Sequence, residues 1–347
     1  MAGLTSITII GAGILGLSCG WEIARRGHHV RVFEAERIGA GASGGTVGAL
    51  APHAPENWNE KKAFQLDSLI LAAPFWAGIE TASGLSSGFG RTGRLQPVPD
   101  ARMAALMEDR IAAAARQWPP TMPMRLTASP ASPLVPDSPT GLWAQDLLSA
   151  RIDPRAALSA AAAAIRAAGG EIVEGRRIED WQRDGPVLWT TGAPGLAMLE
   201  RDLGRPMGTG IKGQSALLRF AAPDAPQIFA QGLHIVPHAN GTTAIGSTSE
   251  NAFDHVDPDA MLDDLIAQAR AVCPALADAP VIDRWAGLRP RARSRAPLLG
   301  AWPGRRGHFV ANGGFKIGFG MAPKIAQVMA DLILQDRDRI PQGFRLR

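Results

Sequence analysis

Residues 5–16 of this chain, TSITIIGAGILG, decide its fold. Residues 5–10 are apolar and rich in β-branched side chains, which is typical of a short buried strand. A glycine-rich turn follows, and an amphipathic helix then extends to Arg26, with Gly27 as its C-terminal cap. Residues 29–33 form a second apolar strand. A strand, glycine turn, helix and strand within about 30 residues predict a parallel βαβ unit.

The three glycines of the turn have separate mechanical reasons. Gly11 permits the tight turn after the strand, Gly13 lets a pyrophosphate approach the backbone, and Gly16 lets the helix pack close to the strand. The free N–H groups at the start of the helix, at Ile14 and Leu15, then face the phosphates at the positive end of the helix dipole. The pattern predicts a dinucleotide site.

Glu34 supports this prediction, because it ends the second strand 18 residues after Gly16. A carboxylate at this position can accept hydrogen bonds from both hydroxyls of an adenosine ribose, and it would repel a 2′-phosphate. NADP is therefore disfavoured, whereas NAD and FAD both stay open at this point. A glycine turn that merely joins a strand to a helix is the alternative explanation.

The composition is that of a globular enzyme. The 347 residues are enough for about two domains, and 46% of them are hydrophobic while 20% are charged. No apolar run reaches about 18 residues, so we expect no membrane span. Two cysteines exclude a disulfide scaffold and a cysteine-based zinc site, and we expect no metal and a cytoplasmic location. The 36 basic and 32 acidic residues are too evenly balanced to indicate nucleic acid.

The pattern of elements changes along the chain. Further helices are predicted at residues 63–81, 101–117, 153–168, 258–272 and 323–334, and antiparallel strands at 212–220, 232–237 and 242–248. We expect an α/β fold, in which a discontinuous Rossmann-like nucleotide-binding domain is joined to an antiparallel-sheet substrate domain with helices. The predicted boundaries are 1–85, 141–211 and 286–347 for the first domain, and 86–140 and 212–285 for the second.

Three further motifs make the chain resemble a known superfamily. They are GAGASGGTVG at residues 39–48, GLRP at 287–290 followed by PLLG at 297–300, and NGGFKIG at 312–318 followed by MAP at 321–323. In this order and spacing they resemble the D-amino-acid oxidase and glycine oxidase superfamily of FAD-dependent oxidoreductases, and most of all the bacterial glycine oxidases. The resemblance extends over the whole chain and implies that the dinucleotide is FAD.

The resemblance also implies where FAD is held. Besides the first glycine turn and Glu34, contacts are expected from Ser43, Thr46, Val47, Ile178, Gly192, Arg289, Gly314, Lys316, Ile317 and Gly318. A strand around Ile178 would face the adenine, and Gly192 would lie near the phosphates. Backbone N–H groups of residues 314–321 would face the flavin N1–C2=O edge, which gains negative charge on reduction. No cysteine lies near residues 39–50 or 312–321, so we expect non-covalent FAD.

Three side chains are candidates for the substrate site. Arg289 matches the arginine that clamps a substrate carboxylate in the superfamily, a role that suits a planar guanidinium. Lys316 matches a position that carries arginine in some glycine oxidases, and His234 stands where relatives have a tyrosine facing the substrate. A surface arginine, a capping lysine and a structural strand histidine are the plain alternatives. The chain has no tyrosine, so other groups must replace the tyrosines that close over the substrate in some relatives.

The reaction that the resemblance implies is oxidation of the C–N bond of an amino or imino acid carboxylate. Hydride leaves the α-carbon for flavin N5 while the neutral amine supplies its lone pair, and the resulting imine hydrolyses. This step needs positioning and a dry pocket rather than a protein base.

Several alternatives stay open. Reoxidation by O2 would make an oxidase, whereas a quinone or another carrier would make a D-amino-acid dehydrogenase. A flavoenzyme acting on a modified tRNA base is a second class, although no RNA-binding module is visible. A flavin-binding protein without turnover is a third. The sequence leaves the substrate, its stereochemistry and any oligomer undecided.

Overall fold

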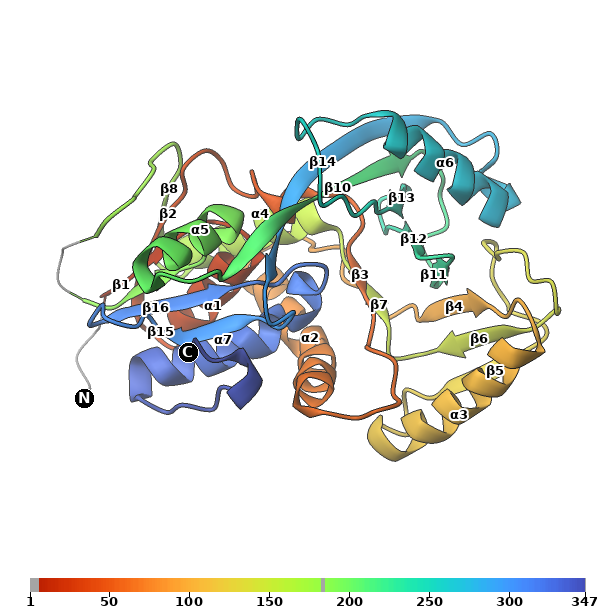
Figure 1. The fold of residues 1–347 in the computed structure, drawn as a ribbon, viewed down its shortest axis with the longest axis horizontal. Helices are drawn as coiled ribbons and strands as arrows, with labels where there is room; N and C mark the ends of the chain where they lie inside the picture. Colours follow the sequence, from red (N-terminus) through yellow and green to blue (C-terminus); the bar gives the residue numbers. More distant parts are fainter. Residues whose placement is uncertain (1–5, 182–184, 347) are drawn as a thin grey trace.

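The computed structural model describes residues 6–181 and 185–346, which form two large sheets with helices around them (Figure 1). A six-stranded, mostly parallel sheet occupies one half of the molecule, and an eight-stranded, mostly antiparallel sheet occupies the other. A short pair, β3 (Ala49–Leu50) and β7 (Ala150–Arg151), lies between the two halves. The predicted fold class, a Rossmann-like α/β core with a second antiparallel sheet, is confirmed.

The six-stranded sheet has the order β15–β16–β9–β1–β2–β8 and contains the predicted βαβ unit. β1 (Ser6–Ile10) and β2 (His29–Phe33) are parallel over their whole length. The remaining strands are β8 (Glu171–Val173), β9 (Val187–Trp189), β15 (Leu298–Ala301) and β16 (His308–Asn312), and only the pair β15–β16 is antiparallel. The predicted first residue of β1, Thr5, lies outside the described residues.

Helices cover both faces of this sheet, and β1 contributes buried isoleucines to the core on each face. Ile7 and Ile9 belong to the core formed with α1 (Ile14–Ala24), α2 (Glu60–Ser83), α4 (Pro154–Ala167) and α7 (Gly318–Gln335). Ile10 points the other way, into the core formed with α5 (Gly192–Leu203). This alternation follows from the two-residue period of a strand. Local signals set the helix ends, as in α4, where the side chain of Asp153 accepts hydrogen bonds from the N–H groups of Arg155 and Ala156.

The eight-stranded sheet has the order β14–β10–β13–β12–β11–β4–β6–β5, and only β4 and β11 are parallel. Its strands are β4 (Arg94–Pro97), β5 (Met124–Thr127), β6 (Trp143–Asp146), β10 (Gly208–Leu218), β11 (Gln227–Ala230), β12 (Leu233–Pro237), β13 (Thr243–Gly246) and β14 (Val281–Ala292). α6 (Ala260–Val272) packs on β10, β12 and β13, and α3 (Ala101–Gln117) packs on β5.

Three segments that were predicted to belong to the nucleotide-binding domain pair in the eight-stranded sheet, and the domain boundaries stay a prediction. β10 and β14 pair from Gly208–Ala292 to Leu218–Val281, with an irregularity in the register between Leu217 and Leu218, so residues 208–211 and 286–292 lie in the eight-stranded sheet. β6 likewise pairs with β4 and β5, although residues 143–146 were assigned to the Rossmann-like part. Cross-strand pairing joins segments that are distant in the sequence, and no local pattern announces it. The ribbon of β10 and β14 runs from one half of the molecule into the other (Figure 1).

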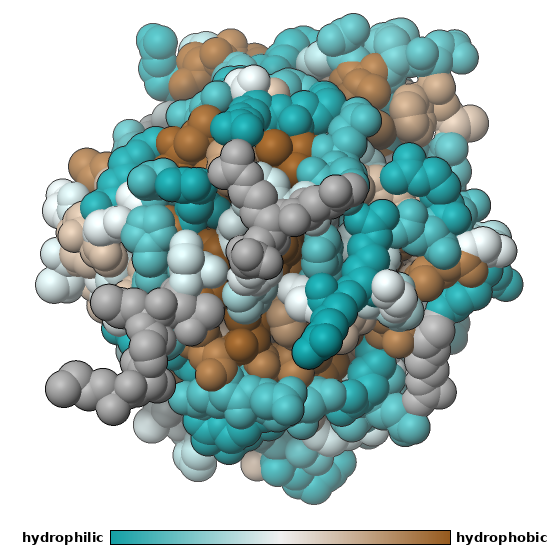
Figure 2. Space-filling view, turned by 90° about the vertical axis from the view of Figure 1, so that its left-hand side faces the viewer, coloured by the Kyte–Doolittle hydropathy of each residue, from teal (hydrophilic) through white to brown (hydrophobic). Residues whose placement is uncertain are grey.

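The surface of the Rossmann-like half is shown in Figure 2, where hydrophilic side chains surround separate groups of apolar residues. None of the helices within residues 6–181 and 185–346 combines the length and apolar character that crossing a membrane requires.

Candidate active site

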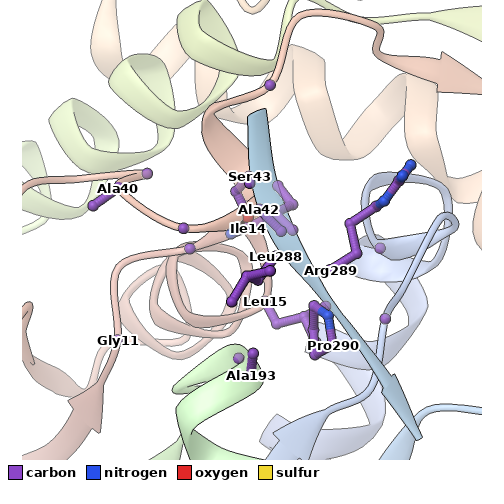
Figure 3. A pocket seen from close by; sticks show the side chains of 18 of the residues that line it. Gly11, Ile14, Leu15, Ala40, Ala42, Ser43, Ala193, Leu288, Arg289 and Pro290 are labelled. Atoms are coloured by element: carbon purple, nitrogen blue, oxygen red, sulfur yellow. Dashed lines mark hydrogen bonds between the residues drawn. The ribbon is translucent and has the colours of Figure 1, made fainter. Parts of the chain in front are cut away.

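A cavity of about 980 Å³ opens at the carboxyl ends of β1, β2 and β9, and residues of both sheets line it. This is the edge at which parallel α/β sheets bind their ligands. Figure 3 shows how the start of α1, the loop around Ser43, the start of α5 and Leu288–Pro290 of β14 gather around it. Most of the residues predicted to hold a cofactor line this cavity, namely Gly11, Gly13, Ile14, Leu15, Glu34, Ser43, Thr46, Val47, Ile178, Gly192, Arg289, Gly314, Lys316 and Gly318.

The first glycine turn has the geometry that its sequence predicts. Gly11 has φ of +108°, and a Cβ there would lie 2.7 Å from the carbonyl oxygen of Thr190. Gly16 does not line the cavity, because it lies against the turn itself, and a Cβ there would lie 2.0 Å from the carbonyl oxygen of Gly11. Its contribution to a cofactor site is therefore the close packing of helix and strand, not contact.

The loop that follows β2 is tied to the start of α1. The N–H of Ile14 donates a hydrogen bond of 3.0 Å to Oγ of Ser43, so the second glycine-rich stretch closes over the first. Glu34 is held in place by two backbone donors, the N–H of Ala12 at 2.8 Å and the N–H of Glu36 at 3.1 Å. Its carboxylate thus stands at the cavity wall at the level of the first glycine turn.

At this end of the cavity, one prediction needs correction and two contacts were not predicted. Ile178 lines the cavity, but it lies outside any strand, because β8 ends at Val173. His238, which no sequence motif singles out, donates a hydrogen bond of 2.8 Å from its Nε2 to the carbonyl oxygen of Thr46. The hydroxyl of Thr46 donates to Oγ of Ser215 at 2.9 Å. The second glycine-rich stretch is therefore fixed to the eight-stranded sheet by contacts that no sequence motif announces.

The segment after β16 differs from the prediction in where its helix begins. α7 starts at Gly318 rather than at residue 323, and Pro323 lies inside it. Ile317 does not line the cavity, since its side chain packs against the main core and its N–H donates to the carbonyl oxygen of Gly314 at 2.9 Å. The N–H of Phe315 is likewise used, by the carbonyl oxygen of Pro290. The first turn of α7 belongs to the predicted range 314–321, its N–H groups lack partners within the helix, and its residues Gly318 and Phe319 line the cavity.

Arg289 lies in the second half of β14 and is buried, with 7% of its surface exposed. Its Nη1 donates a hydrogen bond of 2.6 Å to Oγ of Ser247, and its Nη2 donates to the carbonyl oxygen of Thr248. Its Nε has no partner among the described residues. Burial lowers the pKa of Arg289 to about 10, and the charge of Glu250 opposes this shift. The guanidinium is therefore charged at neutral pH and keeps an unsatisfied donor.

Lys316 and His234 line the same cavity as Arg289. Burial and the charge of Arg289 lower the pKa of Lys316. Burial, with the charges of Arg94 and Lys316, lowers the pKa of His234 to about 3, so its imidazole is neutral at neutral pH. Its Nδ1 is buried and has no partner within the described part of the chain. All three candidates for the substrate site are thus brought together.

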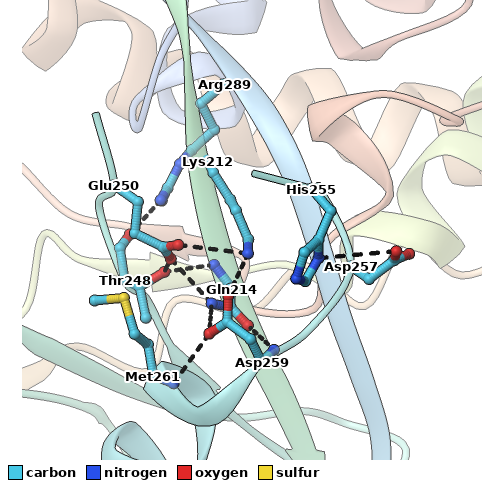
Figure 4. Close-up of polar contacts among 9 residues, drawn as sticks. All are labelled: Lys212, Gln214, Thr248, Glu250, His255, Asp257, Asp259, Met261 and Arg289. Carbon is cyan, nitrogen blue, oxygen red and sulfur yellow. Dashed lines mark hydrogen bonds and ion pairs between the residues drawn. The ribbon is translucent and has the colours of Figure 1, made fainter. Parts of the chain in front are cut away.

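A buried polar network behind Arg289 was not predicted (Figure 4). Lys212, which is 1% exposed, donates to Asp259 and lies 3.5 Å from Glu250. The hydroxyl of Thr248 donates to Glu250, and the amide of Gln214 bridges Glu250 and Asp259 at 3.0 and 2.7 Å. Because Thr248 also accepts from Arg289, the network fixes the backbone that holds the guanidinium.

Other residues that line the cavity were not predicted, because they belong to segments that are distant in the sequence and carry no motif. Phe229, Ser247, Val256 and Trp285 come from three separate stretches of chain, and each looks like an ordinary strand or loop residue in the sequence. Neither Cys19 nor Cys273 lines the cavity.

Comparisons with known proteins agree with this geometry. Residues 6–332 match the model of the family described as FAD dependent oxidoreductase. The chain is 27% identical to glycine oxidase of Pseudomonas aeruginosa over 94% of each chain. It is also 27% identical to glycine oxidase of Geobacillus kaustophilus, over 94% of this chain and 92% of the relative.

Solved structures show the same fold. The crystal structure of glycine oxidase from Geobacillus kaustophilus superposes with a TM-score of 0.85 at 22% identity and covers 99% of both chains. That of iminodiacetate oxidase from Chelativorans has a TM-score of 0.84 at 22% identity and covers 98% of both.

The residues of the cavity fit the cofactor of this family. The glycine cradle at Gly11 and Gly13, the start of α1 and the carboxylate of Glu34 suit the pyrophosphate and ribose of a dinucleotide, and the cavity continues from there to Arg289. The chain is thus an FAD-dependent enzyme and belongs to the FAD dependent oxidoreductase family, within the D-amino-acid oxidase and glycine oxidase superfamily.

Proposed function

We propose that this enzyme oxidises the C–N bond of an amino or imino acid, with Arg289 binding the substrate carboxylate. One observation carries the proposal: a buried guanidinium with an unsatisfied Nε donor lines the same cavity as the dinucleotide cradle. A buried cation is costly without compensation, and a substrate carboxylate in the cavity would compensate the charge of Arg289 through a charge-assisted hydrogen bond to the guanidinium.

The residues around Arg289 suit this chemistry. Bound FAD supplies a two-electron acceptor for the hydride of the substrate α-carbon. Arg289, fixed by Ser247 and Thr248, orients the carboxylate and so the α-carbon. The imidazole of His234 is neutral and adds no further positive charge beside the substrate amine, whose lone pair assists hydride departure once the amine is in its neutral form. The imine formed then takes up water and releases ammonia or a primary amine.

Flavin bleaching with defined substrates tests the proposal. Anaerobic mixing of the FAD-loaded protein with D- and L-amino acids and N-alkyl glycines should bleach the visible absorbance of FAD with at least one of them. A protein that holds FAD but is bleached by none of these carboxylates would contradict the proposal, and bleaching by tRNA alone would favour the base-modifying class.

A variant of Arg289 tests the assigned role. Arg289→Met should raise KM for the carboxylate substrate roughly 100-fold, because a charge-assisted and bidentate contact is lost. Arg284→Met is the matched control, since Arg284 lies on the same strand and pairs with Asp263 at the surface. If both variants leave KM unchanged while FAD content is normal, Arg289 is not the carboxylate anchor.

The electron acceptor requires its own measurement. Reoxidation of the reduced enzyme by air with formation of hydrogen peroxide would make it an oxidase, whereas slow reaction with O2 and fast reaction with a quinone would make it a dehydrogenase. The cytoplasmic location and any oligomer stay predictions.

A further inference from the structure

Positive charge gathers at the substrate end of the cavity, around the ring of Phe315. The guanidinium carbon of Arg289 lies 5.8 Å from the ring centre, that of Arg291 lies 6.0 Å from it, and Nζ of Lys316 lies 5.9 Å from it. Three cations therefore surround one side chain, and their charges are close enough to repel one another.

Nearby carboxylates compensate only part of this charge. Glu250 acts on Arg289, and Lys212 pairs with Asp259 and lies 3.5 Å from Glu250. These two cations and two carboxylates balance one another. Within residues 6–181 and 185–346, no carboxylate lies within ion-pair distance of Lys316 or Arg291, so both are left uncompensated.

The cavity wall shows the same imbalance. Its carboxylates are Glu34, Glu36 and Glu179, which come from the segments after β2 and β8, at the level of the dinucleotide cradle. Around Arg289, the described lining of β10, β12, β14 and residues 314–319 contributes two cations and no carboxylate. His234, which also lines this part, is neutral.

We propose that the enzyme prefers substrates with a second carboxylate, and that Lys316 binds that carboxylate while Arg289 binds the one next to the reacting carbon. The proposal rests on the proposed function. A monocarboxylate leaves Lys316 without a partner, whereas an amino or imino dicarboxylate satisfies both cations of the wall. The two cations lie 5.8 and 5.9 Å from the centre of the same ring and the charge of Arg289 acts on Lys316, so we expect one dicarboxylate to reach both.

Pairs of isosteric substrates test the preference. Iminodiacetate is compared with N-(carbamoylmethyl)glycine, and each enantiomer of aspartate is compared with asparagine, so that only the second charge changes. We expect kcat/KM to be at least tenfold higher for the dicarboxylate of the pair that is turned over. Equal or lower values for the dicarboxylates would overturn the proposal while leaving amine oxidation intact.

Variants of Lys316 identify the residue responsible. Lys316→Met should raise KM for the dicarboxylate about tenfold more than KM for the amide partner, and Lys316→Arg should restore the preference. If Lys316→Met instead slows flavin reduction equally for both members of a pair, the lysine serves the flavin and the proposal is wrong.

A binding experiment separates this inference from the proposed function. Malonate and its monoamide, malonamate, cannot be oxidised, and their binding is followed by the change in the visible spectrum of bound FAD. We expect malonate to bind the wild type about tenfold more tightly than malonamate does. We expect the two compounds to bind Lys316→Met with equal affinity. Equal affinity in the wild type would reject the second anion site. If malonate binds more tightly than malonamate but no amine bleaches the flavin, the proposed function is wrong while the second anion site at Lys316 is supported.

Discussion

Arg289 lies directly over the backbone of Gly213 on the neighbouring strand. A Cβ at Gly213 would lie 1.6 Å from Nη2 of Arg289, so only glycine leaves room for the guanidinium. The backbone at Gly213 is outside the left-handed region, and alanine can therefore adopt its conformation. The small residue is thus required by the neighbouring side chain and not by its own φ.

Gly213→Ala should displace the guanidinium without unfolding the sheet. We expect KM for the carboxylate substrate to rise roughly 10- to 100-fold, because a misplaced anchor misplaces the reacting carbon. Gly210→Ala on the same strand is the control, since its Cβ would meet nothing closer than 3.3 Å. KM is measured together with FAD content and the melting temperature, and an unchanged KM in Gly213→Ala would contradict the packing argument.

His234 should not set the pH dependence of the reaction. Its pKa lies near 3 instead of the ordinary 6.5, because burial and the charges of Arg94 and Lys316 disfavour the imidazolium. We expect wild type and His234→Gln to share the same inflections of kcat/KM from about pH 6 to about pH 9, since the histidine stays neutral throughout. Loss of an inflection in this range in His234→Gln would show that it titrates there.

At the scale of elements, the network of Lys212, Gln214, Glu250 and Asp259 joins β10 to the start of α6. Hydrogen bonds from Lys212 and Gln214 lower the pKa of Asp259 from 3.8 to about 2. A carboxyl whose pKa is depressed by folding contributes stability that is complete above its ordinary pKa and is lost as the pH falls through the folded value.

Asp259→Asn tests this contribution, because the amide oxygen can still cap α6 by accepting from Met261 while the charge is removed. We expect the variant to melt below the wild type at neutral pH, and the difference to shrink as the pH falls from about 4 to about 2. Thermal unfolding followed by circular dichroism at several pH values measures it. A difference that is constant over this range would mean that the charge of Asp259 does not stabilise the junction.

The junction of β1 and α1 is closely packed and, like the contact of Arg289 with Gly213, it requires a glycine. A Cβ at Gly16 would lie 2.0 Å from the carbonyl oxygen of Gly11, which is backbone and cannot rotate away. Gly16→Ala should therefore shift the helix, cost about 1–3 kcal/mol of unfolding free energy and weaken FAD binding at least tenfold. Gly20→Ala in the same helix is the control, because its Cβ would meet side-chain methyl groups no closer than 3.0 Å. Equal FAD affinity in both variants would contradict this account.

On the scale of the whole molecule, bound FAD should stabilise the folded protein, because the cavity is lined by residues of both sheets. A ligand at about 100 times its Kd adds about 2.7 kcal/mol to the stability of a fold that binds it only when native. We expect FAD to raise the melting temperature of the apoprotein by several degrees. FMN lacks the adenosine that Glu34 and Ile178 are predicted to contact, and we expect it to raise the melting temperature much less. A thermal melt with each flavin measures this. Equal shifts of the melting temperature would mean that the flavin part of FAD, and not its adenosine, makes the main stabilising contacts.

Local signals made part of this molecule predictable. The β1–α1–β2 unit follows from β-branched residues at period two, glycines at fixed spacing and an amphipathic helix. Most of the predicted cofactor residues line one cavity, because the glycine motifs act through their own backbone. The start of α7 was placed too late because proline usually occupies the first turn of a helix, whereas Pro323 is accommodated five residues into it.

The sequence by itself determined the Rossmann-like unit, the dinucleotide site and the resemblance that points to FAD, since these depend on residues that are neighbours along the chain. Only the tertiary structure decided the pairing of β10 with β14, the seat of Arg289 over Gly213 and the network of Lys212, Glu250 and Asp259. Those contacts join residues from separate strands and loops, and their energies come from burial and charge compensation that exist only once the chain has folded.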